Sequence, residues 1–401
     1  SMLQGKTIVL GVTGSIAAYK IANLASMLVK QRASVHVIMT RNACNFITPT
    51  TFETLTGNKC LIDTFDRNFE FQVEHVSLAQ KADLFLIAPA TANVIGKLAH
   101  GICDDMLTTT VFATKAPKLV SPAMNTNMWE NPILQDNLAT LKHYGYDIIS
   151  PVSGRLACGA VGSGKMPSEE VLMSHILLHV GKEKDLQGKH ILVTAGPTQE
   201  AIDPVRYITN HSSGKMGYAL AKMAVMRGAS VTLVSGPVNI EPFIGIDVVN
   251  VKSAADMAEA VAARSEASDI VVMCSAVADY TPTHYSAQKV KKSDGELSIP
   301  LARTTDILHT LGMKKKEGQM LVGFSMETEN LIENSRKKLN KKNADIICAN
   351  TIADGGDTGF AVDTNQVTLI TETEVITLPL CTKEETADLI LSHIVELQKE
   401  K

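Results

Sequence analysis

The same local pattern opens both halves of the chain: an apolar run, a glycine-rich turn, an amphipathic stretch and a second apolar run. In the first half, residues 6–11 lead through the turn 11–15 into a helix predicted over 16–31 and a strand over 35–40. In the second half, a strand over 190–194 leads through such a turn into a helix from Lys215 and a strand over 230–234. Each pattern is a βαβ opening, which requires a parallel sheet covered by helices. We therefore predict an α/β protein of two domains, each a Rossmann-like parallel sheet with helices on both faces.

Further apolar runs extend both predicted sheets. Buried strands are expected over 83–89 and 118–122 in the first half, and over 269–274 and 345–349 in the second. The first domain, 1–180, is predicted to end with a helix over 168–180. The segment 181–188 is charged and bracketed by glycines, so we predict a linker there. The second domain, 189–401, is expected to end with an antiparallel hairpin (366–370 and 374–378) and a helix over 383–398.

Composition narrows the class of protein. A chain of 401 residues with 45% hydrophobic residues can bury two full cores. The net charge of −4 argues against nucleic acid or an anionic membrane as a partner. No apolar run reaches the roughly 18 residues of a membrane-spanning helix. The seven cysteines are scattered without a CxxC pair, which favours free thiols in a reducing cytoplasm.

The loop after the strand over 190–194 is rich in glycine, proline and polar residues. It contains Ala195-Gly196-Pro197-Thr198, then Asp203-Pro204-Val205-Arg206, and then the stretch Asn210 to Gly217. An α/β protein holds anionic ligands at such a place, past the carboxyl end of a strand and at a helix N-terminus. The loop therefore predicts an anion-binding site in the second domain.

The corresponding turn in the first half, Gly11 to Ser15, is a weaker signal. It lacks the full GxGxxG fingerprint, and Thr40 stands where an acidic residue would bind the ribose of NAD. The turn favours a mononucleotide phosphate at the helix N-terminus. A two-domain NAD(P)-dependent dehydrogenase stays open as an alternative, because the chain has two glycine-rich βαβ openings.

Two motifs carry a resemblance to known enzymes. The string Pro122-Ala123-Met124-Asn125-Thr126-Asn127-Met128-Trp129 follows a strand and holds the only Trp of the chain. Together with Ala88-Pro89-Ala90-Thr91-Ala92-Asn93, His75 and Ser15, it makes the first domain resemble flavin-dependent cysteine decarboxylases. The loop after Ala195 makes the second domain resemble phosphopantothenate–cysteine ligases. The whole chain resembles the bacterial bifunctional family of coenzyme A biosynthesis that fuses phosphopantothenoylcysteine decarboxylase to that ligase.

For the first domain, the resemblance implies a flavodoxin-like fold and bound FMN, which accepts electrons from the cysteinyl group so that CO2 can leave. His75 would handle the proton during oxidation, Asn125 would bind the substrate carboxylate, and Cys158, in a glycine-rich segment typical of a flap, would protonate the product. Asn125 could instead merely cap the following helix. The FMN-binding residues that the resemblance implies are Gly14, Ser15, Thr40, Ala90, Thr91 and Thr108.

For the second domain, the resemblance implies that 4′-phosphopantothenate attacks the α-phosphorus of CTP, giving an acyl-cytidylate that cysteine then converts to the amide. Asn210 matches the residue that binds the intermediate, and Lys289, in Lys289-Val290-Lys291-Lys292, the residue of the activation step. Asp279 would serve CTP or Mg²⁺. Thr305 stands where the family usually has Pro, and CTP over ATP follows from the resemblance alone. The implied CTP-binding residues are Met273, Cys274, Ser275, Asp279, Lys289, Asp306, Ile307, Phe324, Lys338 and Lys342.

The resemblance also implies an assembly and leaves one alternative of another class. Trimers of the flavin domain and dimers of the ligase domain would combine into a homo-oligomer, a dodecamer. Some relatives of flavin decarboxylases are non-catalytic flavin-binding regulatory subunits. The presence of His75, Asn125 and Cys158 on one chain argues against that alternative.

Overall fold

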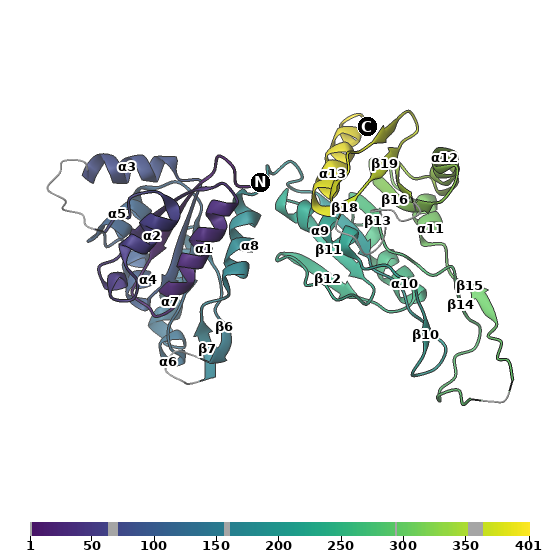
Figure 1. Cartoon of the computed structure of the whole chain (residues 1–401), viewed down its shortest axis with the longest axis horizontal. Coiled ribbons are helices and arrows are strands. Elements are labelled where there is room, and N and C mark those ends of the chain that lie inside the picture. Colours follow the sequence, from purple (N-terminus) through teal and green to yellow (C-terminus); the bar gives the residue numbers. More distant parts are fainter. Residues whose placement is uncertain (1, 63–70, 156–160, 293–294, 352–363) are drawn as a thin grey trace. The chain divides into compact units, whose positions relative to one another are not determined.

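The computed structural model describes residues 2–62, 71–155, 161–292, 295–351 and 364–401 (Figure 1). The chain divides into two compact units, Ser1–Lys182 (unit 1) and Glu183–Lys401 (unit 2). Each unit has its own sheet and its own hydrophobic core, so each is described by itself.

Unit 1 is built on a five-stranded, fully parallel sheet of order β2-β1-β3-β4-β5. This is the flavodoxin-like order, in which a ligand binds where the chain switches direction between the first and third strands. The strands are apolar on both faces because helices cover both faces. Their bounds are β1 (Thr7–Val12), β2 (Ser34–Met39), β3 (Leu84–Ala90), β4 (Lys118–Pro122) and β5 (Asp147–Ile148).

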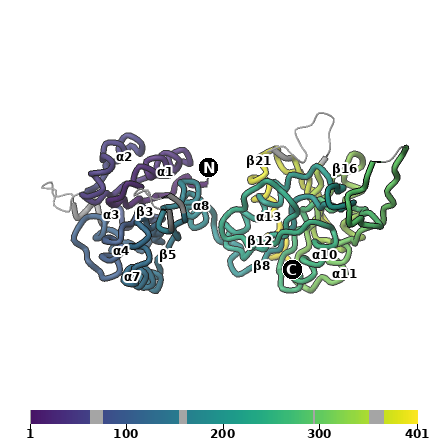
Figure 2. The backbone as a smooth tube through the Cα atoms, turned by 90° about the horizontal axis from the view of Figure 1, so that it is seen from below, coloured from purple at the N-terminus to yellow at the C-terminus, as the bar shows by residue number. Residues whose placement is uncertain are grey.

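The helices of unit 1 lie on the two sides of this sheet. In Figure 2, α1 and α2 lie on one side of β3, and α4 and α7 lie on the other. The core against α4 and α7 includes Phe85, Ile95 and Leu138. The helices are α1 (Ala18–Lys30), α2 (Pro49–Thr56), α3 (Phe71–Lys81), α4 (Ala92–His100), α5 (Met106–Ala113), α6 (Thr126–Trp129), α7 (Pro132–His143) and α8 (Glu169–Val180), with a 3₁₀ turn η1 (Asn42–Asn45) and a hairpin of β6 (Val152–Arg155) and β7 (Val161–Lys165).

Unit 2 has an eight-stranded sheet of order β12-β11-β8-β13-β16-β17-β19-β20. Its first six strands are parallel and follow the Rossmann order 3-2-1-4-5-6, which places the switch point between β8 and β13. The last two strands are antiparallel. The bounds are β8 (His190–Ala195), β11 (Ser230–Ser235), β12 (Ile246–Asn250), β13 (Ile270–Met273), β16 (Met320–Glu327), β17 (Ile346–Thr351), β19 (Val367–Ile370) and β20 (Val375–Thr377).

Helices cover both faces of this second sheet as well. α9 (Lys215–Met226) packs with α13 (Lys383–Lys399), and α11 (Ile307–Lys314) lies beside α10 (Ala254–Ser265) and α12 (Leu331–Lys342) (Figure 1). Three short antiparallel pairs extend from this body: β9 (Glu200–Ala201) with β10 (Tyr207–Ile208), β14 (Tyr280–Pro282) with β15 (Leu301–Arg303), and β18 (Thr364–Asn365) with β21 (Cys381–Thr382).

The two parallel α/β sheets predicted from the sequence are confirmed, and so is the terminal hairpin, now β19 and β20. The helix after the first glycine-rich turn begins at Ala18, two residues later than predicted. The segment 183–188 is anchored to unit 2: the buried guanidinium of Arg227 donates to both carboxylate oxygens of Asp185 at 2.8 and 2.5 Å. Its Nη1 also donates to Asp388 at 3.2 Å.

Candidate active sites

The loops that follow β8 and β13 are joined at the switch point of the second sheet. Pro197 and Ala276 form an isolated parallel bridge, and the Ala276 N–H donates to the Gly196 carbonyl at 2.9 Å. The Thr198 hydroxyl accepts from the Ala278 N–H at 2.9 Å. The sheet ladder thus continues beyond the strands, so both loops are held in one position relative to each other.

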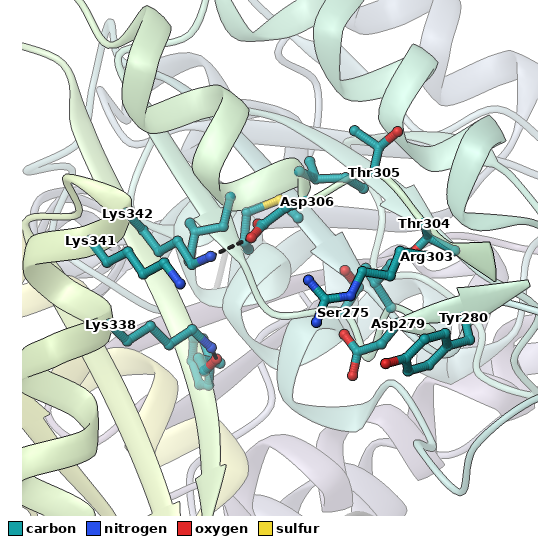
Figure 3. Close-up of a pocket in the computed structure, with 15 residues that line it drawn as sticks. Ser275, Asp279, Tyr280, Arg303, Thr304, Thr305, Asp306, Lys338, Lys341 and Lys342 are labelled. Atoms are coloured by element: carbon teal, nitrogen blue, oxygen red, sulfur yellow. Dashed lines mark hydrogen bonds and ion pairs between the residues drawn. The ribbon is translucent and has the colours of Figure 1, made fainter.

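A cavity of about 480 Å³ opens beside these loops, at the carboxyl ends of β13 and β16 (Figure 3). This volume lies within the roughly 300–1,000 Å³ typical of small-molecule sites. The cavity gathers most of the nucleotide-binding residues predicted from the sequence. Its lining comprises Met273, Ser275, Val277, Asp279, Tyr280, Arg303, Thr304, Thr305, Asp306, Ile307, Leu308, Phe324, Lys338, Lys341 and Lys342.

One wall of this cavity is cationic. Lys338, Lys341 and Lys342, from the last turns of α12, lie together on one side in Figure 3. The Lys338 ammonium donates to the Phe324 carbonyl at 2.7 Å, and burial lowers its pKa, with the charge of Lys342 acting in the same direction. These cations come from one helix face at i, i+3 and i+4 spacing, which is the spacing that brings side chains together.

Asp306 lies between the lysines and the opposite wall. It caps α11 by accepting from the His309 N–H at 3.0 Å, and it forms an ion pair with Lys342. Burial opposes its ionisation, yet the hydrogen bonds from Lys342 and His309 hold the pKa of the Asp306 carboxyl below its usual value. Asp306 therefore orients a lysine of the cationic wall.

The opposite wall carries Asp279, Tyr280 and Arg303, which Figure 3 shows facing the lysines across the cavity. Tyr280 and Arg303 are paired residues of the β14–β15 ribbon. The described residues contain no cluster of three or more His, Cys, Asp or Glu that could hold a metal by themselves. Mg²⁺ is commonly bound by one or two carboxylates together with substrate phosphates, and Asp279 fits that mode.

Asn210 lies at the junction of the two loops. Its amide nitrogen donates to the Ala276 carbonyl at 2.9 Å, and its amide oxygen accepts from the Ser212 N–H at 3.1 Å. The helix that follows, α9, begins after Gly214, which has a φ of 82° and no side chain with which to cap the helix. A glycine is required there because other residues rarely adopt this conformation.

Lys289 is not part of the cavity lining. Its side chain is exposed on the loop between β14 and β15. Its neighbour Val290 is hydrogen-bonded to the turn at 203–206, through the Asp203 carboxylate at 3.0 Å and the Arg206 guanidinium at 3.0 Å. The structure thus attaches the lysine segment to the same loop that carries Asn210.

Cys274 is also outside the lining, although its two neighbours line the cavity. The residue as a whole is half-buried, but burial of its thiol raises the pKa to about 12. Ser275 shares a hydrogen bond of 2.8 Å with the buried Thr194 hydroxyl. A protonated thiol in this place is a packing group, and its neighbour Ser275 offers the polar contact.

Unit 1 has a cavity of about 670 Å³ at its own switch point. Gly14, Thr40 and Thr91 of the predicted FMN set line it. An added Cβ on Gly14 would lie 2.4 Å from the amide nitrogen of Asn42, so the backbone is closely approached at this turn. The full lining is Gly14, Thr40, Arg41, Asn42, Ile62, Thr91, Ala92, Asn93, Val94, Lys97, Asp104, Asp105 and Met128.

The other predicted FMN residues surround this cavity without lining it. Ser15 lies in the turn before α1, where its hydroxyl accepts from the Ala17 N–H at 3.2 Å. Ala90 is fully buried at the end of β3. Thr108 is buried and forms a capping box with Asp105, and Asp105 itself lines the cavity. The α1 helix has no side-chain cap, which favours an anion at its N-terminus.

The predicted reacting groups of unit 1 are described only in part. Asn125 is exposed and caps α6: its side-chain oxygen accepts from the Met128 N–H at 2.9 Å. The capping alternative and a role at the substrate are compatible, because the amide nitrogen is not used by this contact. His75 lies in α3, but its side chain is outside the described part, and Cys158 lies outside the described residues.

Sequence reasoning missed several cavity residues. Arg303 and Thr304 enter the unit 2 site because β14 and β15 pair across the eighteen residues 283–300. Asn42 and Asp105 enter the unit 1 site from turns after β2 and before α5. For Asn42 a signal was available, since it stands two residues beyond Thr40 at the same strand end. Arg303 could have been suspected only from its position before the helix cap Asp306.

Two family models match adjoining parts of the chain. The model described as "Flavoprotein" matches residues 1–181. The model described as "DNA/pantothenate metabolism flavoprotein C-terminal domain" matches residues 186–397. No helix in the described ranges has the length and apolar character needed to cross a bilayer.

Relatives of full length are also found. The chain is 47% identical over 403 aligned residues to the "Coenzyme A biosynthesis bifunctional protein CoaBC" of Bacillus subtilis (strain 168), covering 100% of this chain and 99% of that protein. It is 44% identical to the protein of the same name from Vibrio parahaemolyticus, covering 98% and 99%.

Solved structures resemble the two parts separately. The crystal structure of the C-terminal domain of a coenzyme A biosynthesis bifunctional protein CoaBC is 46% identical, covers 55% of this chain and 100% of its own, and has a TM-score of 0.47. The FMN-binding protein AtHal3 is 31% identical, covers 44% of this chain and 96% of its own, and has a TM-score of 0.38.

Proposed function

We propose that the cavity of unit 2 is the ligase site and the cavity of unit 1 the flavin site, because the chain belongs to the family of bifunctional coenzyme A biosynthesis proteins. The chain is a bifunctional enzyme of this pathway, with phosphopantothenoylcysteine decarboxylase and phosphopantothenate–cysteine ligase activities. The family resemblance drawn from the motifs is confirmed. A dehydrogenase and a non-catalytic flavin-binding subunit are not favoured.

The ligase assignment rests on one observation: a single cavity gathers Ser275, Asp279, Asp306, Phe324, Lys338 and Lys342. An amide bond can form only if the carboxylate is first activated. The carboxylate oxygen of 4′-phosphopantothenate attacks the α-phosphorus of CTP, and pyrophosphate leaves. The amine of cysteine then attacks the acyl carbon, CMP leaves with the electron pair of the broken C–O bond, and a proton is released.

The residues of the cavity suit these two steps. The three lysines of α12 neutralise the triphosphate, and Asp306 keeps Lys342 in place. Asp279 binds Mg²⁺ together with the phosphates. Phe324 packs against the base. Asn210, fixed on the Ala276 carbonyl, faces the acyl intermediate, and Lys289 acts in its formation.

The decarboxylase assignment rests on the unit 1 cavity at a flavodoxin-like switch point. Bound FMN supplies the electron sink that lets the carboxylate leave. Gly14 and Ser15, in the turn before α1, would hold its phosphate, and Thr40 and Thr91 line the site, with Ala90 and Thr108 behind them. Asn125 orients the substrate carboxylate, His75 moves the proton of oxidation, and Cys158 protonates the product.

We further propose that the chain works in the cytoplasm as a homo-oligomer, with 4′-phosphopantothenate, cysteine and CTP as its small-molecule partners. A dodecamer of trimers and dimers is the assembly proposed. In support of a reducing compartment, the seven cysteines are scattered along the sequence without a CxxC pair.

One reconstitution tests the proposal. The purified full chain is incubated with 4′-phosphopantothenate, cysteine, Mg²⁺ and either CTP or ATP, while pyrophosphate and CO2 are measured separately. We expect pyrophosphate with CTP, CO2 after a lag, and a flavin spectrum in the untreated protein. Pyrophosphate without CO2 would refute the flavin assignment, and CO2 only from added phosphopantothenoylcysteine would refute the ligase assignment. Sedimentation of the same sample measures the oligomeric state.

A further inference from the structure

Asp203 is a buried carboxylate that the chemistry above does not use. Only 2% of it is exposed, although it lies in a surface turn. Its Oδ1 accepts from the N–H groups of Val205 and Arg206 at 2.8 and 2.7 Å. Its Oδ2 accepts from the N–H of Val290 at 3.0 Å, eighty-seven residues further along the chain. The hydrogen bond from Val290, followed by those from the turn, holds the pKa of the Asp203 carboxyl below its usual value.

The segment that carries Lys289 is held through both backbone groups of Val290, its N–H and its carbonyl. While Asp203 accepts from its N–H, the guanidinium of Arg206 donates to its carbonyl at 3.0 Å. The Ser286 N–H donates to the Ile202 carbonyl at 3.0 Å. The backbone beside Lys289 is therefore held at three points, and its side chain stays exposed and able to move toward a ligand.

The same turn is rigidly connected to Asn210. The β9–β10 pair closes the turn, since Ala201 pairs with Tyr207. The Thr209 hydroxyl donates to the Thr198 carbonyl at 2.8 Å, and Asn210 donates to Ala276. One continuous set of hydrogen bonds thus runs from the Lys289 segment through Asp203 to the residue that faces the intermediate.

We propose that Asp203 is a positioning residue of the ligase, which holds Lys289 in register with Asn210 so that both reach the same acyl group. The proposal rests on the proposed role of Lys289 in the ligase step. A merely structural role is the competing explanation, because an aspartate in a turn also stabilises the turn by itself.

Asp203→Asn separates these two roles. The amide oxygen can still accept from Val205 and Arg206, so the turn is kept. The amide nitrogen then faces the N–H of Val290, where donor meets donor and the tether is lost. We expect the ligase kcat to fall by about 10- to 100-fold, the loss typical of a misplaced reacting group. The KM for CTP and the decarboxylase activity of the same protein should stay unchanged.

A double variant gives the sharper readout. If Asp203 acts through Lys289, then Asp203→Asn should cost nothing further in a Lys289→Gln background, because residues that act as a unit are non-additive. Independent, multiplicative losses would overturn the positioning role. The matched control is Asp247→Asn, an exposed aspartate on β12, which should behave as the wild type.

The outcomes distinguish this proposal from the one on which it rests. A fully active Lys289→Gln would refute the role of the lysine itself. An inactive Lys289→Gln with a fully active Asp203→Asn would refute only the positioning role. Equal losses of kcat and CTP affinity in Asp203→Asn would indicate a collapsed turn and also overturn it. Should Asp203→Asn fail to fold, Asp203→Glu, which keeps both acceptor oxygens, is measured in the same way and should show a partial loss confined to kcat.

Discussion

The two candidate sites are lined by different kinds of groups. In unit 2, charged side chains oppose one another across the space: the lysines of α12 face Asp279 and Arg303, and Asp306 stands between them. In unit 1, the cavity is lined by the backbone of Gly14 and by threonine and asparagine side chains. Its lining also includes the Lys97–Asp104 ion pair at 2.9 Å, in which the aspartate is exposed.

This difference fits the ligands proposed for the two sites. A triphosphate that arrives and leaves in every cycle needs cations that neutralise its charge, and lysines on a helix face supply them. A flavin that stays bound needs close backbone approach and a helix N-terminus for its one phosphate. We therefore expect ligand binding in unit 2 to depend mainly on the cationic wall, and flavin binding in unit 1 to depend mainly on the close backbone approach at Gly14.

The largest effect is expected for Asn210→Asp, which tests whether a negative charge at this position lowers the ligase activity and leaves the decarboxylase activity unchanged. In Asn210→Asp, the donor to the Ala276 carbonyl is lost and a negative charge is placed beside an anionic intermediate. We expect ligase turnover to fall by at least about 100-fold, as when an oriented donor is removed from an active site. Pyrophosphate release from CTP measures the ligase, and CO2 release from added phosphopantothenoylcysteine measures the decarboxylase, which should not change.

Asn250→Asp is the matched control for this variant, since Asn250 is exposed at the end of the outer strand β12. Loss of both activities in Asn210→Asp would show that the two units are not independent. An unchanged ligase would remove Asn210 from the site.

Gly14→Ala tests the dependence of the unit 1 site on shape. The new Cβ would lie 2.4 Å from the amide nitrogen of Asn42, so this residue of the cavity lining must shift. Because Asn42 lines the cavity, its displacement changes the shape of the proposed flavin site, and we expect flavin affinity to fall. The flavin absorbance per chain after gel filtration measures the loss, with ligase activity as the internal standard.

Two further variants sharpen this test. Gly14→Ala combined with Asn42→Ala should recover part of the flavin, because the clash is removed. Gly96→Ala in α4 is the control, since its nearest neighbour would be 3.6 Å away. Full flavin content in Gly14→Ala would show that the close approach at this turn has no part in binding.

The fold and the sites were predictable from the sequence to different degrees. The strands before Gly14 and before Ala195 were readable because strands buried on both faces are continuous apolar runs. Phe324, Asp306 and Lys338 are far apart in sequence, and only the motif resemblance placed them together. The pairing of Tyr280 with Arg303 could not be predicted, because the β14–β15 ribbon depends on a non-local contact. The tether between Asp203 and Val290 is of the same kind, and no local pattern marks it.

The smallest expected effect concerns how CTP binding to the cationic wall changes with pH. Burial and the neighbouring Lys342 lower the pKa of Lys338, while Glu327, Asp306 and Asp279 act in the opposite direction. Lys338 therefore loses its positive charge at a lower pH than an ordinary lysine does, and triphosphate binding weakens as the pH rises through that pKa. The KM for CTP should rise on the alkaline side by at most about tenfold per pH unit, since one proton is linked.

Lys338→Arg should shift this alkaline rise to higher pH, because a guanidinium stays charged throughout the accessible range. Lys337→Arg, at an exposed position paired with Glu333 at 3.4 Å, should leave the profile unchanged. The flavin content of unit 1 should show no such dependence on either lysine, because neither of them lines the unit 1 cavity. An identical alkaline rise in Lys338→Arg and the wild type would assign the titration to another group, and the charged wall would then act through Lys341 and Lys342 alone.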